Sequence, residues 1–258
     1  MPSRKIRILH APSPLGLKPP AEGRIPGVRH MAEKLRALGL HDALGADFAG
    51  VVEPLPYVAH RDPVRRMRNA DAIAGYSRDL AAAVGKLLDE PGFPLVLGGD
   101  CSIALGVAMA LRRRGRFGLL YLDAHSDCQT PDTSETGGVA GMPLTMITGR
   151  GPDLLTPMVD QRPQVAESDV VLLGCRDLFD ITTRKDESHV VGTRIRVRDL
   201  DEIRRTGPVA VARDVLRGLS EAGVEQLWIH LDVDVLDPVI MPAVDSPDPG
   251  GLTEKELV

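Results

Sequence analysis

The sequence has little of what marks several classes of protein. Its 31 Lys and Arg residues are outnumbered by 36 Asp and Glu, and this net charge of -5 argues against the basic face of a nucleic-acid-binding protein. No apolar run approaches the roughly 18 residues of a membrane span, and the N-terminus lacks the apolar core of a signal peptide. Three cysteines, an odd number, suggest no disulfide framework. We therefore expect a cytoplasmic protein without a nucleic-acid or membrane partner.

What the chain does have is a regular alternation of apolar strands and helical patterns, without internal repeats or a low-complexity linker. Strands are expected at residues 6–9, 48–52, 94–97, 117–122, 170–173, 193–197 and 227–231. Helices are expected at residues 28–38, 69–88, 102–113, 142–148 and 209–219. This order predicts a single α/β domain over residues 1–258, with a mainly parallel central sheet covered on both faces. Ligands of such sheets bind at the carboxyl ends of the strands.

Two of the expected strands end in clustered acids. The strand over residues 117–122 runs into an Asp-x-His-x-Asp triplet, and the strand over residues 227–231 runs into Asp-x-Asp. Alternate residues of an extended chain share one face, so each set projects together. The candidate metal ligands are Asp123, His125, Asp127, Asp232 and Asp234. Ionised carboxylates a few Å apart repel by roughly 4 kcal/mol per pair at an effective dielectric near 20, and two divalent ions would cancel the four charges. The pattern predicts a two-metal site.

A third motif, Gly-Gly-Asp-Cys-Ser, lies between an expected strand and an expected helix and contains Cys101. It lacks the Lys-Ser/Thr ending of a nucleotide-binding loop, so we interpret its glycines as allowing close backbone approach. Cys101 is a sixth candidate ligand, although a lone cysteine also fits as a small buried residue. His230, two residues before Asp232, is interpreted at most as a support for the ligands.

The three motifs, ending with His-Leu-Asp-Val-Asp-Val-Leu-Asp-Pro, occur in the order found in ureohydrolases. From about residue 94 to its end the chain resembles the arginase–agmatinase–formiminoglutamase family, with a weaker match over residues 9–17. This resemblance implies a three-layer α/β/α fold and a binuclear manganese centre. It also implies a hydrolase of guanidino- or ureido-type C–N bonds and a homo-oligomer, a trimer or hexamer.

The resemblance further implies a role for each candidate residue. Asp123 and Asp232 would bridge the two ions, Cys101 and Asp127 would complete one ion's shell, and His125 and Asp234 the other's. Two cations would lower the pKa of a bridging water enough to supply hydroxide, which would attack the planar carbon of the substrate.

The same resemblance assigns proton transfer and substrate binding. Asp127 would take the proton of the hydroxide and pass it to the departing amine. Gln129 and Thr136 would bind the substrate.

Several positions depart from the family pattern. Cys101 stands where the family usually has His, and relatives acting on O-ureidoserine are similar in having Cys there. A thiolate improves binding of zinc or iron, although the hard carboxylates keep manganese as the first expectation. Ala140 occupies the place of a catalytic His in arginases, Gln129 that of an Asn gripping the substrate carboxylate, and Phe179 that of an acid contacting the substrate amino group. We therefore do not expect L-arginine itself as the substrate.

Family members continue beyond Thr253 through a strand with a guanidinium-binding Glu, so we expect this sequence to belong to a longer chain. The departures at Cys101 and Ala140 also support an alternative, a non-catalytic metal-stabilised binding or assembly protein. The complete set of clustered acids favours the hydrolase. A deacetylase of similar sheet is a third interpretation, but its paired-His loop is not evident.

Overall fold

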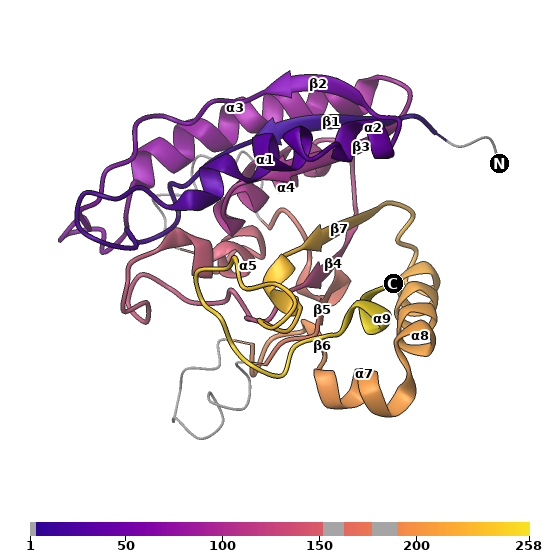
Figure 1. The fold of residues 1–258 in the computed structure, drawn as a ribbon. Coiled ribbons are helices and arrows are strands. Elements are labelled where there is room, and N and C mark those ends of the chain that lie inside the picture. The colour runs from indigo at the N-terminus through magenta and orange to yellow at the C-terminus, as the bar shows by residue number, and fades with distance from the viewer. Residues whose placement is uncertain (1–3, 152–162, 177–189) are drawn as a thin grey trace.

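The computed structural model describes residues 4–151, 163–176 and 190–258. Parallel strands flanked by helices give the expected three-layer α/β/α fold (Figure 1). The strands pair as two hydrogen-bonded sheets, in the orders β2-β1-β3 and β6-β5-β4-β7, and every pairing is parallel. The prediction of an α/β fold with parallel strands is therefore confirmed, while its single sheet is divided into two among the described residues.

Among the described residues, seven strands lie where the sequence predicts them, apart from shifts at their ends. They are β1 Ile6–Ala11, β2 Asp47–Val51, β3 Phe93–Gly98, β4 Gly118–Leu122, β5 Val170–Leu173, β6 Arg196–Arg198 and β7 Leu227–Leu231. The helices are α1 Met31–Ala37, α2 Leu40–Ala43, α3 Ala70–Asp89, α4 Ala104–Arg112, α5 Pro143–Ile147, α7 Leu200–Thr206, α8 Pro208–Glu221 and α9 Glu254–Leu257. Helix α7 was not expected from the sequence; it begins where the Asp199 side chain accepts a hydrogen bond from the backbone N–H of Glu202.

Strand β4 lies between two hydrophobic clusters. Its Leu119 and Tyr121 side chains are fully buried in the larger cluster, which α3 and α4 also line. Leu120 belongs to a second cluster with residues of β5, α7 and α8. Because apolar atoms cover both its faces, β4 is a rigid support for the residues that follow it.

Strand β7 is packed differently, because it pairs only with β4 among the described residues. Its Leu227, Ile229 and Leu231 side chains are 46%, 61% and 47% exposed, while the alternate residues Trp228 and His230 turn inward. Period-two alternation is what one exposed face of a strand requires.

In the described ranges no helix combines the length and the apolar character needed to cross a bilayer.

Candidate metal centre

Asp123 follows the last residue of β4 and is 1% exposed. Its Oδ1 accepts a hydrogen bond from the backbone N–H of His125 at 2.7 Å. Its Oδ2 is buried and has no hydrogen-bond partner within the described part of the chain. A buried carboxylate oxygen without a donor is costly, so this atom calls for a cation.

His125 and Asp234 contact each other close to Asp123. The Nδ1 atom of His125 is 2.8 Å from Asp234 Oδ2 and 3.6 Å from Asp123 Oδ1. Asp234 Oδ1 accepts a hydrogen bond from the backbone N–H of Ala124 at 3.0 Å. Ligand atoms of these three side chains all lie within 4.8 Å of one another, which is compact enough to hold one metal ion. Burial lowers the pKa of His125, but its bonds to Asp123 and Asp234 outweigh burial and raise that pKa to about 12. In the absence of metal the imidazolium thus supplies the counter-charge.

Cys101 and Asp232 form another contact near Asp123. Cys101 is the first residue of a 3-10 turn, η2 Cys101–Ile103, and its Sγ donates to Asp232 Oδ2 at 2.9 Å. Asp232 Oδ1 accepts from the backbone N–H of Asp234 at 2.9 Å. Burial, and then the charge of Asp234, raises the pKa of Asp232 to about 6. Burial and the nearby acids raise the pKa of the Cys101 thiol well above its ordinary value. A cation would reverse both shifts by favouring the anionic forms.

A second compact group joins Cys101 and Asp123 to His230, again with ligand atoms within 4.8 Å of one another. Asp123 belongs to both groups, so it is placed to contact two ions. His230 was not a predicted ligand. Burial lowers its pKa to about 4, so its imidazole is neutral at pH 7.

Asp127 is buried and adopts a left-handed backbone conformation, with φ of 49°. Such a conformation is uncommon outside glycine and is often found at functional sites. The Tyr121 hydroxyl donates to Asp127 Oδ2 at 2.6 Å, and the Asp127 carbonyl accepts from the backbone N–H of Leu144. Asp127 lies outside both compact groups, but its charge raises the pKa of Asp123 and Cys101, so it is their close electrostatic neighbour.

The six predicted ligands therefore surround a common region. Burial and mutual repulsion raise the pKa of Asp123 and Asp232, and burial raises that of Asp127 well above its ordinary value. Carboxylate oxygens, an imidazole and a thiol are all donors that divalent metals accept. The residues fit a pair of divalent cations, because Asp123 Oδ2 and His230 Nε2 are buried without hydrogen-bond partners in the described residues.

The glycines before Cys101 have the role that the sequence analysis gave them. A Cβ atom on Gly99 would lie 2.2 Å from the Ser13 carbonyl oxygen, which only glycine avoids. The buried Asp100 carboxylate accepts from the backbone N–H groups of Gly16 and Ser102, both at 2.9 Å. These bonds tie the loop after β1 to the turn that carries Cys101.

Arg176 was not assigned a role from the sequence. Its side chain is 7% exposed, and its guanidinium donates to the carbonyl oxygens of Asp234, Val235 and Asp248 at 2.8–3.0 Å. Its backbone N–H also donates to the Ala124 carbonyl. Arg176 thus fastens the segment carrying Asp232 and Asp234 to the end of β5. Its place shortly after the apolar strand β5 was the available signal.

The predicted substrate residues lie on the loop that follows Asp127. Gln129 is exposed, and its backbone N–H donates to the Gly141 carbonyl, while Thr136 Oγ1 accepts from the backbone N–H of Gly138 at 3.0 Å. The Ala140 backbone N–H donates to the Gly16 carbonyl at 3.1 Å, which brings this loop to the one after β1. The roles of Gln129 and Thr136 stay predictions, and Phe179 lies outside the described residues.

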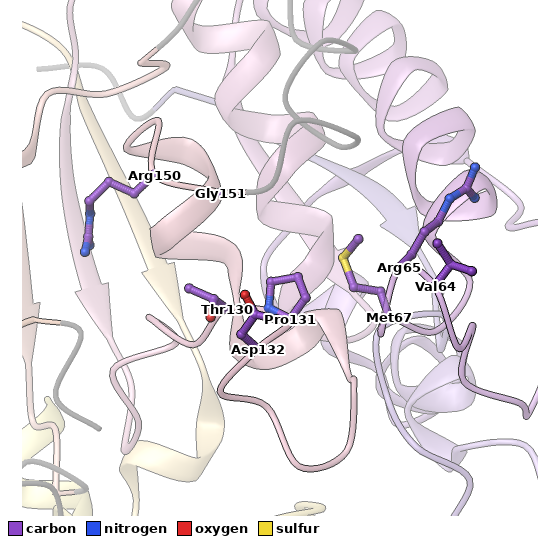
Figure 2. A pocket seen from close by; sticks show the side chains of 8 residues that line it. All are labelled: Val64, Arg65, Met67, Thr130, Pro131, Asp132, Arg150 and Gly151. Atoms are coloured by element: carbon purple, nitrogen blue, oxygen red, sulfur yellow. The ribbon is translucent and has the colours of Figure 1, made fainter. Parts of the chain in front are cut away.

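Figure 2 shows a separate cavity of about 380 Å³. Its lining residues are Val64, Arg65, Met67, Thr130, Pro131, Asp132, Arg150 and Gly151. None of them is a candidate metal ligand. The guanidinium groups of Arg65 and Arg150 are already paired, with Asp71 and Glu167. This cavity is therefore distinct from the centre around Asp123.

Solved structures of arginases share this three-layer α/β/α fold. Arginase from Bacillus caldovelox matches with a TM-score of 0.82 and 31% identity, covering 98% of this chain and 83% of that one. Arginase from Bacillus subtilis matches with a TM-score of 0.83 and 27% identity over the same shares. Proclavaminate amidinohydrolase from Streptomyces clavuligerus, 21% identical with a TM-score of 0.68 over 99% of this chain and 76% of that one, shares the fold.

The sequence comparisons give the family. Residues 19–258 match the arginase family, and the chain belongs to it. It is 35% identical over 198 residues to the curated arginase of Bacillus caldovelox, covering 76% of this chain and 64% of that protein. The Bacillus subtilis arginase is 34% identical over 191 residues, 74% of this chain and 62% of that protein. The matched part of the chain thus spans slightly less than two thirds of these relatives.

Proposed function

We propose that this chain provides the metal centre of a hydrolase that cleaves a guanidino- or ureido-type C–N bond. The observation that carries the proposal is the position of Asp123, whose carboxylate belongs to two compact ligand groups and has a buried oxygen without a partner among the described residues. Buried acids at this density are costly in a protein that does not bind cations. The arginase relatives support the reaction class.

The proposed ligands divide between two positions. Asp123 and Asp232 would contact both ions, with Cys101 and Asp127 on one ion and His125 and Asp234 on the other. When bound, two divalent ions supply Lewis-acid activation of water and offset the charge that develops during hydrolysis.

Asp127 is the proposed proton carrier. Its pKa is raised by burial, which makes its carboxylate a stronger base than an exposed aspartate. The 2.6 Å hydrogen bond from the Tyr121 hydroxyl to Oδ2 holds this carboxylate in one orientation. The left-handed backbone at Asp127 fits this interpretation, because strained residues concentrate at reacting centres.

Substrate recognition would involve Gln129 and Thr136, on the loop between Asp127 and α5. Ala140 offers no proton-transferring group, which supports a guanidino or ureido compound other than L-arginine. Manganese is the proposed metal of the centre, with zinc and iron as alternatives because of the Cys101 thiol. We further propose one domain over residues 1–258, a homo-trimer or homo-hexamer, and a cytoplasmic location, in keeping with three free cysteines.

The test is product release from a panel of guanidino and ureido compounds. The metal-free protein is reconstituted separately with manganese, zinc and iron, and release of urea, ammonia and amine is followed. We expect turnover of at least one compound, lost in Asp127→Asn and kept in Asp79→Asn, which changes an exposed acid of α3. No release with any metal, from protein that binds two ions, would instead support the metal-stabilised binding or assembly protein.

A further inference from the structure

Beside Cys101 lies a potential metal ligand that the proposed ligand set does not use, the imidazole of His230. His230 lies on β7, two residues before Asp232 and directly opposite Tyr121 on β4. One of its ring nitrogens lies within 4.8 Å of the ligand atoms of both Cys101 and Asp123. Its Nε2 is buried and has no hydrogen-bond partner in the described residues. A buried imidazole nitrogen without a partner, on a histidine that lies beside a thiol and a carboxylate, needs a physical explanation.

Aromatic neighbours hold this imidazole in one orientation. The ring stacks on Tyr121 with centroids 4.2 Å apart and planes 9° apart, and it meets Trp228 edge-on at 5.8 Å. A side chain held this way loses little further freedom when it binds a metal, so less of the binding energy is lost to ordering.

From this geometry, resting on the proposed hydrolytic centre, we infer that His230 is a metal ligand. With Cys101 and Asp123 it forms a thiolate–imidazole–carboxylate group that selects zinc at one of the two positions. The other position, formed around His125 and Asp234, has no sulfur donor and accepts manganese. The centre is then a mixed-metal site.

The donor chemistry supports zinc at the sulfur side. Zinc takes Cys, His and Asp ligands together. Thiolate donors favour zinc over manganese, and a given protein site generally binds zinc more tightly than manganese. A second soft donor beside Cys101 would therefore strengthen zinc binding there, and His230 is the side chain that supplies this donor.

The test uses His230→Phe, which keeps a ring to stack on Tyr121 and removes both nitrogens. The purified protein is loaded with one equivalent of zinc in excess manganese, and the zinc surroundings are read by X-ray absorption at the zinc edge. Wild type is expected to show one sulfur at about 2.3 Å and one imidazole nitrogen at about 2.0–2.1 Å. His230→Phe should lose the imidazole signal and bind zinc at least about tenfold more weakly.

Two matched variants make the result decisive. His125→Asn removes the histidine of the other position and should leave the sulfur and imidazole signals of zinc unchanged, as should His60→Asn at an exposed histidine. Cys101→Ser should remove the sulfur. An imidazole signal that survives in His230→Phe, or disappears in His125→Asn, would overturn the inference.

Binding and turnover separate the two proposals. An active hydrolase whose zinc lacks the His230 signal would contradict only the inference about His230. A protein with the sulfur and imidazole signals intact, but without turnover on any guanidino or ureido compound, would contradict only the proposed function.

Discussion

The two strands that carry the candidate ligands, β4 and β7, reach the same centre from different surroundings. β4 lies between β5 and β7 and is buried on both faces. β7 pairs only with β4 among the described residues and leaves one apolar face exposed. The difference shows that two kinds of support hold one site. Packing on both faces holds β4 beneath its acids, while the acids after β7, whose strand is exposed on one face, depend more on hydrogen bonds and ion pairs.

Those polar supports are specific. Arg176 holds the carbonyls after β7, Asp234 is bonded to the backbone of Ala124, and Asp232 is bonded to Cys101. We call Asp232 and Asp234 the β7 half of the centre, and Asp123, His125 and Asp127 the β4 half. We therefore expect the loss of polar groups to loosen the β7 half more than the β4 half.

The largest effect should come from Asp123→Asn, which alters the residue shared by both ligand groups. Losing this charge removes a donor common to both positions, so metal content should fall from two ions per chain to fewer than one. Activity should fall by about 10³-fold or more, the scale of losing a group that stabilises the reacting centre. Metal analysis and rates on the same samples check this. Two retained ions would show that Asp123 is not shared.

Arg176→Lys tests the polar support of the β7 half of the centre. The compact ammonium of lysine cannot reach all three carbonyl oxygens that the planar guanidinium bonds. At least one buried carbonyl after β7 therefore loses its partner. We expect a loss of about 1–3 kcal/mol in the free energy of unfolding, the cost of an unsatisfied buried group. Urea denaturation measures it, with Arg205→Lys at an exposed site as the control. Equal free energies of unfolding for the two variants would show that Arg176 does not support the segment after β7.

Tyr121→Phe tests the β4 half without changing its packing. Removing the hydroxyl deletes the hydrogen bond that favours ionised Asp127, so the pKa of Asp127 should rise further. The acidic limb of the kcat/KM profile should therefore move to higher pH, with kcat about tenfold lower. Tyr76→Phe, whose hydroxyl bonds the Val52 carbonyl away from the centre, should leave the profile in place. An unmoved profile in Tyr121→Phe would exclude this positioning role.

The smallest effect concerns pH and the β7 residue Asp232, whose pKa is raised to about 6. Between its unfolded value near 3.8 and about 6, the folded metal-free chain binds more protons at Asp232 than the unfolded chain. Its contribution to stability is therefore present at low pH and falls as the pH rises through that window. Metal binding has the opposite dependence and should weaken up to about tenfold per unit below pH 6. Calorimetric titrations at several pH values measure it, and equal affinity at pH 5 and pH 7 would contradict it.

Much of the fold and part of the centre could be predicted from sequence because their determinants are local. The clustering of Asp123, His125 and Asp127 depends on how one short segment leaves β4, and Gly99 marks the close approach that positions Cys101. The short helix α7 was missed because so few residues give a weak periodic signal.

The role of His230 and the contacts of Arg176 could not be predicted in the same way. His230 meets Cys101 only when β7 and the turn after β3 come together, and Arg176 binds carbonyl oxygens, which carry no sequence signal. Such contacts depend on tertiary packing, and a pattern along the chain does not contain them.

Anomalous diffraction from crystals of the metal-loaded protein tests the central claim most directly. We predict two metal peaks, both within bonding distance of the Asp123 carboxylate, one beside Cys101 and the other beside His125. A single peak, or peaks that leave Asp123 without a metal contact, would contradict the binuclear centre on which the hydrolytic function depends.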